Sequence, residues 1–231
     1  HPEDYDGQWG IWDEKFLQYV ARELGTLPQP FFAAEFTLSS HHPFRVPDEY
    51  KSVLPKGSHP MHQVIAYSDM ALRRFFETAS KQPWYDNTLF VIVADHAVPG
   101  ALDEYKTTAG IFRVPIILFD PRGQLVGREP HQVVCQADLY PTILDLVGDT
   151  HPMVAFSSSA FDPNRPRFAV QEIGGMYQMI EGDWLLHFDG TQPKALYNLR
   201  TDPKQTTDLK DQPNTPLPTM LLRLKAYLQE Y

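Results

Sequence analysis

Two pairs of ionisable residues carry the side chains best suited to chemistry in this chain. Asp95 and His96 directly follow an apolar run, residues 89–94, whose β-branched residues predict a buried strand. His41 and His42 follow a second run of strong β formers, residues 31–38. A carboxylate beside an imidazole can form half of a divalent-metal site, and histidines bind metals or oxyanions and move protons near neutral pH.

The elements around these pairs predict that they meet in space. Residues 61–80 carry apolar side chains at helical spacing and separate the two predicted strands, 31–38 and 89–94. In a right-handed βαβ unit, both strands end at the same edge of the sheet. That edge, outside the carboxyl ends of the strands, is where ligands bind in open α/β sheets.

Each of these residues also has a purely structural interpretation. Asp95 can cap a turn and His96 can be a satisfied edge histidine, while Pro43 can fix a turn that leaves the preceding imidazoles solvated. Lys106 and Arg113 flank a loop that could reach the same edge and hold an anionic group there. Such residues are more often surface charges or packing supports.

Asp13 has two interpretations of its own. It lies beside Trp9 and Trp12, where it could contact a polar headgroup. It also lies in the first turn of a predicted helix over residues 12–24, where a carboxylate suits the positive end of the helix dipole. The single cysteine, Cys135, reads as a small core residue.

The pattern of predicted helices and strands changes near residue 150 and divides the chain into two parts. The first part, residues 1–150, predicts an α/β core with a mostly parallel sheet between helices. Residues 151–231 predict a small antiparallel β region and a closing helix, because short strand-like pieces alternate with Gly and Asp turns. The further predicted elements are a strand at 114–119, a helix at 136–147, strands at 167–172, 177–180 and 184–188, and a helix at 217–231.

Composition limits the classes of partner. The 231 residues carry a formal net charge of −9, which argues against nucleic-acid binding because little would neutralise phosphates. No apolar stretch is long enough to span a bilayer, and no signal peptide is present. The first residue is His1 rather than methionine, so we expect the chain to be a fragment or processed piece of a longer protein.

A series of short motifs resembles the lipoteichoic acid synthase-like sulfatases of the alkaline phosphatase superfamily. Their order and spacing are typical of that group, and the match covers most of the chain. The motifs are WGIWDE at 9–14, TLSSHHPF at 37–44, YSD at 67–69, YDNTLF at 85–90, DH at 95–96, RVP at 113–115, QADLYPT at 136–142, ALYNL at 195–199 and DP at 202–203.

The resemblance implies an α/β/α sandwich, an active site at the C-terminal edge of the strands, and one divalent metal ion. Manganese is expected before magnesium, zinc or calcium. By motif, Asp95 and His96 resemble two metal ligands. His41 resembles the catalytic histidine that contacts the transferred phosphoglycerol group, and His42, Lys106 and Asp13 are weaker candidates for binding the substrate.

The chain also departs from the family pattern. In the family, a threonine or formylglycine nucleophile and an acidic metal ligand precede the Trp-Gly segment, so this chain is expected to hold about half of an active site. The loop from Lys106 to Arg113 is shorter than in arylsulfatases, and Ala97 replaces the glycine that commonly follows the Asp-His pair.

The expected function is therefore that of a metal-dependent phosphoglycerol transferase or sulfatase-like hydrolase. Its substrate would be a phosphate or sulfate ester of a lipid headgroup or glycan, and the parent protein would be anchored at the cell membrane with this domain outside the cytoplasm. The alternative is a non-catalytic sulfatase-fold module that binds a glycan or lipid headgroup. A phosphodiesterase or phosphonate hydrolase of the same superfamily is a third possibility.

Overall fold

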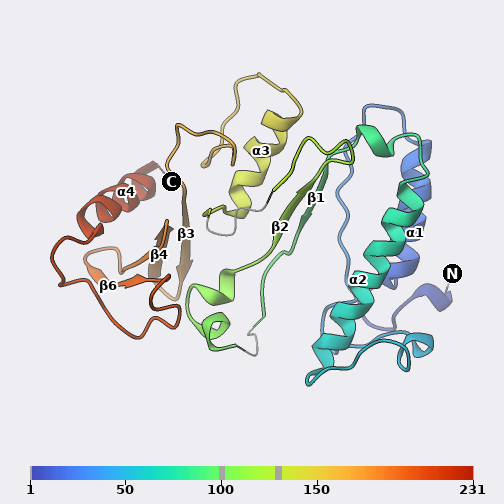
Figure 1. The fold of residues 1–231 in the computed structure, drawn as a ribbon, viewed down its shortest axis with the longest axis horizontal. Coiled ribbons are helices and arrows are strands. Elements are labelled where there is room, and N and C mark those ends of the chain that lie inside the picture. The colour runs from blue at the N-terminus through green and yellow to red at the C-terminus, as the bar shows by residue number, and fades with distance from the viewer. Residues whose placement is uncertain (1, 99–101, 128–131, 231) are drawn as a thin grey trace. The chain divides into compact units, whose positions relative to one another are not determined.

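The computed structural model describes residues 2–98, 102–127 and 132–230 (Figure 1). The chain divides into two compact units. Unit 1 comprises residues 1–91 and 117–126, and unit 2 comprises residues 92–116 and 127–231. Within the described residues, no helix has the length and apolar character needed to cross a membrane.

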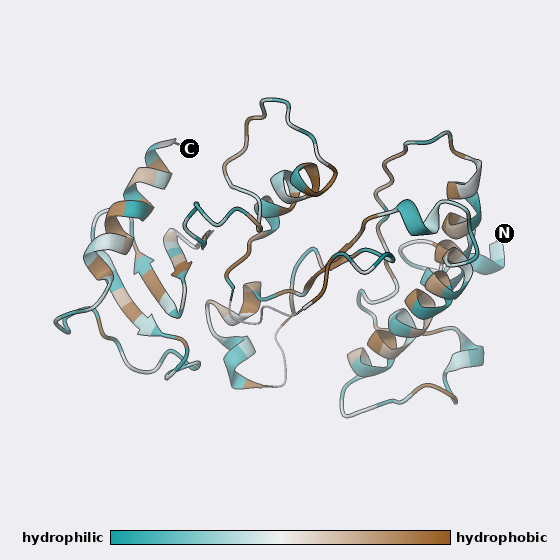
Figure 2. Cartoon of the chain, turned by 45° about the horizontal axis from the view of Figure 1, so that its top comes forward, coloured by the Kyte–Doolittle hydropathy of each residue, from teal (hydrophilic) through white to brown (hydrophobic). Residues whose placement is uncertain are grey.

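Unit 1 is built on two packed helices, α1 (Asp13–Glu23) and α2 (Pro60–Ala79), which confirm the two helices predicted there. Along each helix, hydrophobic residues alternate with hydrophilic ones (Figure 2), as expected when one face packs on a core. The core between them is formed by buried apolar side chains, namely Leu17, Val20, Ala21, Leu24, Ala71, Phe75, Ala79 and Trp84.

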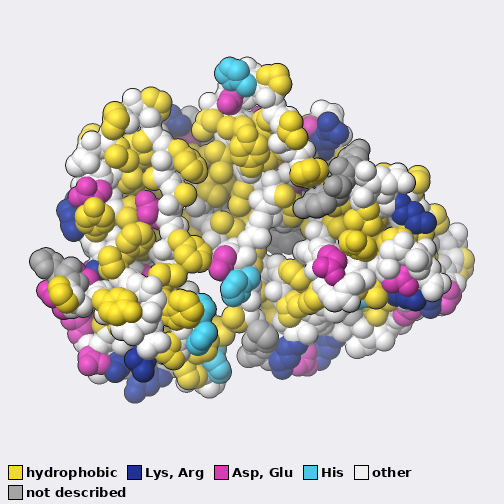
Figure 3. Space-filling view, turned by 180° about the vertical axis from the view of Figure 1, so that it is seen from behind, with side chains coloured by type: hydrophobic (Ala, Val, Ile, Leu, Met, Phe, Trp, Pro, Cys, Tyr) yellow, Lys and Arg dark blue, Asp and Glu magenta, His cyan; other side chains and the backbone are white. Residues whose placement is uncertain are grey.

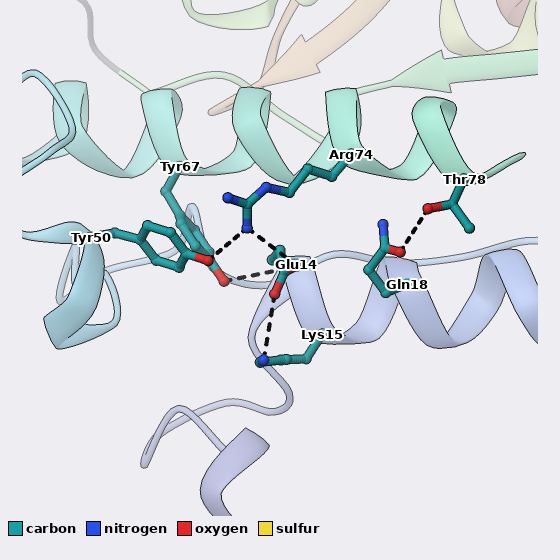
Figure 4. Close-up of polar contacts among 7 residues, drawn as sticks. All are labelled: Glu14, Lys15, Gln18, Tyr50, Tyr67, Arg74 and Thr78. Carbon is teal, nitrogen blue, oxygen red and sulfur yellow. Dashed lines mark hydrogen bonds and ion pairs between the residues drawn. The ribbon is translucent and has the colours of Figure 1, made fainter. Parts of the chain in front are cut away.

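Polar contacts also join the two helices on their partly exposed side (Figure 4). One guanidinium nitrogen of Arg74 donates to the hydroxyl oxygen of Tyr50 at 2.7 Å and lies 3.4 Å from a carboxylate oxygen of Glu14. The backbone N–H of Glu14 donates to the hydroxyl of Tyr67, whose pKa burial raises well above its usual value. These contacts fix the start of α1 against the middle of α2.

Two short strands, β1 (Phe90–Val93) and β2 (Ile116–Phe119), pair as a two-stranded sheet and confirm two of the predicted strands. The ring centroids of Phe90 and Phe119 lie 5.8 Å apart, and both rings pack against Phe76 of α2. The residues of β1 are half-buried or exposed rather than fully buried.

The predicted strand at residues 31–38 is wrong. The segment forms no regular element, and Phe32 and Phe36 are 82% and 64% exposed. A strand needs ladder partners for its N–H and C=O groups, and within the described residues no strand pairs with this segment. Exposed hydrophobic side chains are not confined to this segment, and Figure 3 shows them over much of one face of the molecule.

Unit 2 contains the predicted antiparallel region. A four-stranded sheet has the order β3 (Phe168–Ile173), β4 (Met176–Glu181), β5 (Trp184–Phe188) and β6 (Pro193–Asn198), with every neighbouring pair antiparallel. Helix α4 (Leu217–Glu230) packs on it through Met220 and Leu224, and α3 (Leu139–Leu146) precedes it in the chain. The mostly parallel sheet stays a prediction, because β1 and β2 are the only described strands outside this antiparallel sheet.

Candidate functional site

The histidine pair lies in a short loop of unit 1 that is held by its own turns. The backbone N–H of His41 donates to the carbonyl of Leu38 at 3.1 Å, and the N–H of Phe44 donates to the carbonyl of His41 at 3.2 Å. The Nδ1 atom of His41 lies 2.9 Å from the carbonyl oxygen of His42. Because a carbonyl oxygen can only accept, Nδ1 carries the proton and Nε2 is left for a ligand or for proton transfer.

Three residues that the sequence did not assign to the site, Trp9, Arg45 and Asp6, lie near His41. The indole N–H of Trp9 donates to the carbonyl of His42 at 2.9 Å, and the Trp9 and His41 rings lie 4.2 Å apart. Arg45 and Asp6 line the same small surface pocket as Trp9 and His41. Trp9 lies within the WGIWDE motif, but nothing in the sequence predicts its hydrogen bond to the carbonyl of His42.

Asp13 is placed differently from a residue that contacts a substrate. It is 1% exposed, and its carboxylate accepts hydrogen bonds from Leu38 N, Ser39 N and Ser68 Oγ at 2.9, 2.9 and 3.0 Å. A direct contact with a substrate, which we predicted, would require this side chain to leave those partners. Its place as the first residue of α1 agrees with the helix-terminus interpretation.

Asp95 and His96 lie just beyond β1, as predicted, and both side chains are more than half exposed. A carboxylate oxygen of Asp95 lies 3.5 Å from Nε2 of His96. The Nδ1 atom of His96 lies 3.0 Å from the carbonyl oxygen of Ala97 and must donate to it. Nε2 is therefore the nitrogen that can bind a metal, as in metal sites where the other ring nitrogen donates to a carbonyl.

Gln136 holds the end of β1 from a distant part of unit 2. Its side-chain nitrogen donates to the carbonyls of Ala94 and Asp95 at 2.7 and 2.9 Å. Gln136 opens the QADLYPT motif and the 3₁₀ turn before α3. The motif could have marked Gln136 as functional, but nothing in the sequence pairs it with Asp95.

Lys106 lies in a loop that is fastened to the C-terminal sheet of unit 2. Its side chain is 52% exposed, and its ammonium lies 3.4 Å from a carboxylate oxygen of Asp103. The amide of Gln205 bonds the hydroxyls of both Thr107 and Thr108 at 2.8 Å, and the Thr108 hydroxyl lies 3.0 Å from Nε2 of His187. The loop is thus positioned, and the Lys106 side chain is partly exposed beside Asp103.

The burial of His187 predicts that acid destabilises unit 2. Burial lowers the pKa of His187 below its ordinary value of 6.5. The unfolded chain therefore takes up a proton first as pH falls below 6.5, so stability is lost from there down to the folded pKa. In urea unfolding at pH 7.5 and 5.5, His187→Gln should show a smaller loss of stability between the two pH values than the parent. An unchanged difference would contradict this role.

The four principal candidates are divided between the two units. His41 and His42 belong to unit 1, and Asp95 and His96 belong to unit 2. Their convergence at one edge therefore stays a prediction. Among the residues that the structure describes, no group of three or more His, Cys, Asp or Glu side chains could hold a metal ion.

Comparison with known proteins identifies the family. The family model described as Sulfatase matches residues 1–149. A lipoteichoic acid synthase-like protein of Bacillus subtilis, YvgJ, is 27% identical over 188 residues, which cover 72% of this chain and 30% of that protein. Lipoteichoic acid synthase 2 of the same organism is 30% identical over 165 residues, which cover 63% of this chain and 25% of that protein. The chain thus spans less than a third of the length of these relatives.

Solved structures show the same fold. A protein of the alkaline phosphatase superfamily from Vibrio parahaemolyticus superposes with a TM-score of 0.73 and 23% identity, over 96% of this chain and 56% of that one. The lipoteichoic acid synthase LtaP from Listeria monocytogenes superposes with a TM-score of 0.70 and 20% identity, over 85% of this chain and 56% of that one. The chain therefore belongs to the Sulfatase family, and the relatives that it matches include lipoteichoic acid synthase-like proteins.

Proposed function

We propose that the chain contributes part of the active site of a metal-dependent phosphoglycerol transferase or sulfatase-like ester hydrolase. Family membership supports the general class, and the arrangement of Asp95 and His96 is the observation that carries the proposal. His41 is proposed as the catalytic histidine, with His42 and Lys106 as substrate contacts. We assign no nucleophile among the residues that the structure describes.

Asp95 and His96 fit a divalent cation by donor type and spacing. Ligand atoms about 2.1 Å from one ion lie about 3.0 Å apart in an octahedral site and about 3.4 Å apart in a tetrahedral one. The carboxylate oxygen of Asp95 and Nε2 of His96 are 3.5 Å apart, so both atoms can reach one ion. An Asp and a His accept manganese, magnesium, zinc or calcium in differing degrees, and we propose manganese first. A bound divalent cation would stabilise negative charge on the attacking and transferred oxygens.

His41 and Arg45 supply the groups suited to an anionic ester. Nε2 of His41 can donate to an oxygen of the transferred phosphoryl or sulfuryl group, or protonate the leaving oxygen. Arg45 lines the same pocket, and its guanidinium can bind two such oxygens at once. The substrate class we propose is a phosphate or sulfate ester of a lipid headgroup or glycan, met at the outer side of a cell membrane.

The test uses the full-length protein that contains this chain. It would be supplied with vesicles of a phosphoglycerol-headgroup lipid, and separately with an aryl sulfate, before and after removal of metal with EDTA. Release of diacylglycerol that returns when Mn²⁺ is added back, with the phosphoglycerol group found on an acceptor alcohol, would support the transferase, and aryl sulfate hydrolysis would support the sulfatase. Vesicle binding without turnover, unaffected by EDTA, would instead favour the non-catalytic binding module.

A further inference from the structure

Asp13 is a buried carboxylate that no cationic side chain among the described residues pairs by a hydrogen bond. It is 1% exposed, and the hydrogen-bond partners of its carboxylate are two backbone amides and one hydroxyl, all of them uncharged. By contrast, the buried Asp120 lies 3.3 Å from the guanidinium of Arg122. Hydrogen bonds from neutral donors to an ionised oxygen, together with the N-terminal dipole of α1, stabilise the Asp13 charge where it is.

Asp13 and Ser39 bond each other reciprocally across 26 residues of sequence. The carboxylate of Asp13 accepts from Ser39 N, and the hydroxyl of Ser39 accepts from Asp13 N at 2.9 Å. Trp12, the residue that precedes α1, provides no side-chain cap, so Ser39 acts as the cap of the helix from another segment. Ser68 of α2 binds the second oxygen of the same carboxylate. One buried side chain thus joins two helices and a loop.

The loop joined in this way is the one that carries His41. Asp13 holds the N–H groups of Leu38 and Ser39, and the carbonyl of Leu38 accepts the hydrogen bond from His41 N that closes the turn. The other side of the loop is held by the contact from the exposed Trp9 to the carbonyl of His42. Loss of the Asp13 carboxylate would free the buried side of the loop and let the imidazole of His41 move.

We propose that Asp13 is a positioning residue, which sets the place of the His41 imidazole through Leu38 and Ser39 without touching the substrate. The inference rests on the proposed function, in which His41 acts on the transferred group. It replaces the direct substrate contact predicted for Asp13 with an indirect role. A displacement of a reacting group by about 1 Å can cost about 100-fold in rate, so a loose His41 loop should lower kcat strongly.

The test is a double-mutant cycle in the full-length protein with a phosphoglycerol-headgroup lipid as substrate. Asp13→Ala should lower kcat about 10- to 100-fold, with KM changed less than about threefold. The same substitution placed in His41→Ala should cost little more, because both act through one group. Asp13→Asn keeps a carbonyl oxygen for the two amides and should recover most of the activity. Glu23→Ala, which removes an exposed carboxylate from the other end of α1, is the matched control and should leave kcat and KM unchanged.

Three results would overturn the proposal. They are full activity of Asp13→Ala, an unchanged cost of that substitution in the His41→Ala background, and a rise in KM without a fall in kcat. Where Asp13→Ala fails to fold, Ser39→Ala carries the same cycle, and a urea midpoint for each variant separates instability from misplacement.

A second readout keeps this inference separate from the proposed function. A protonated imidazole quenches indole fluorescence on contact, and Trp9 lies 4.2 Å from His41. The difference in emission between the parent and Trp9→Phe should therefore depend on pH, and this dependence should weaken in Asp13→Ala. If no ester is turned over, the proposed function fails, and this titration still decides the role of Asp13. If the pH dependence of Trp9 quenching is the same in the parent and in Asp13→Ala, the proposed positioning role of Asp13 is wrong.

Discussion

Asp95→Ala should abolish metal retention and lower turnover by about 1,000-fold or more in the full-length protein. A catalytic metal contributes several kcal/mol to the transition state, and each 1.4 kcal/mol is about tenfold in rate. The Asp95 carboxylate oxygen and Nε2 of His96 lie 3.5 Å apart, a spacing that suits two ligands of one ion. Metal content measured after gel filtration in a metal-free buffer, together with kcat, checks this expectation.

Gln136→Leu provides the graded comparison for that experiment. It leaves both proposed ligands in place but removes the bonds to the carbonyls of Ala94 and Asp95. Groups that orient metal ligands typically change affinity or activity about 10- to 100-fold, so this variant should lie between the parent and Asp95→Ala. If Asp95→Ala retains a stoichiometric amount of metal and normal turnover, Asp95 and His96 are not the metal ligands.

His41→Ala should lower kcat by about 100- to 10,000-fold, the range that a positioned general acid or base contributes. His41→Asn tests the same position with a side chain that can still donate a hydrogen bond. If His41 only binds the transferred group, Asn should recover part of the rate and keep the shape of the pH–rate profile. If it moves a proton, Asn should stay as slow as Ala, and one limb of the profile should disappear.

His42→Ala is the neighbouring comparison for this site. The contact that Trp9 makes with residue 42 uses the backbone carbonyl, which alanine retains. We therefore expect less than about a tenfold fall in activity, consistent with an exposed side chain at the edge of the substrate. A larger loss from His42→Ala than from His41→Ala would reverse the two assignments.

Most helices and strands could be predicted because their signals are local. The apolar spacing in α1 and α2, and the short β-rich segments after residue 150, agree with the structure to within a few residues. The segment at 31–38 has the same composition as a strand, but composition does not supply a partner. Phe32 and Phe36 remain exposed because no strand among the described residues pairs with or covers that segment.

The candidate site was predicted in its residue types but not in its supports. Asp95, His96 and His41 could be singled out because each follows an apolar run or belongs to a family motif. Their supporting partners lie far away in sequence. Gln136 is 41 residues from Asp95, and Ser39 is 26 residues from Asp13. Such pairs are decided by tertiary packing, which a single sequence does not display.

The long-range cap on α1 ties the formation of this helix to that of the histidine loop. The first two N–H groups of α1 find their acceptors on Ser39 and on Tyr67 of α2, not within their own segment. A peptide of α1 alone would leave both groups without these acceptors and fray at its start. We therefore expect the start of the helix, the middle of α2 and the loop before His41 to become ordered together.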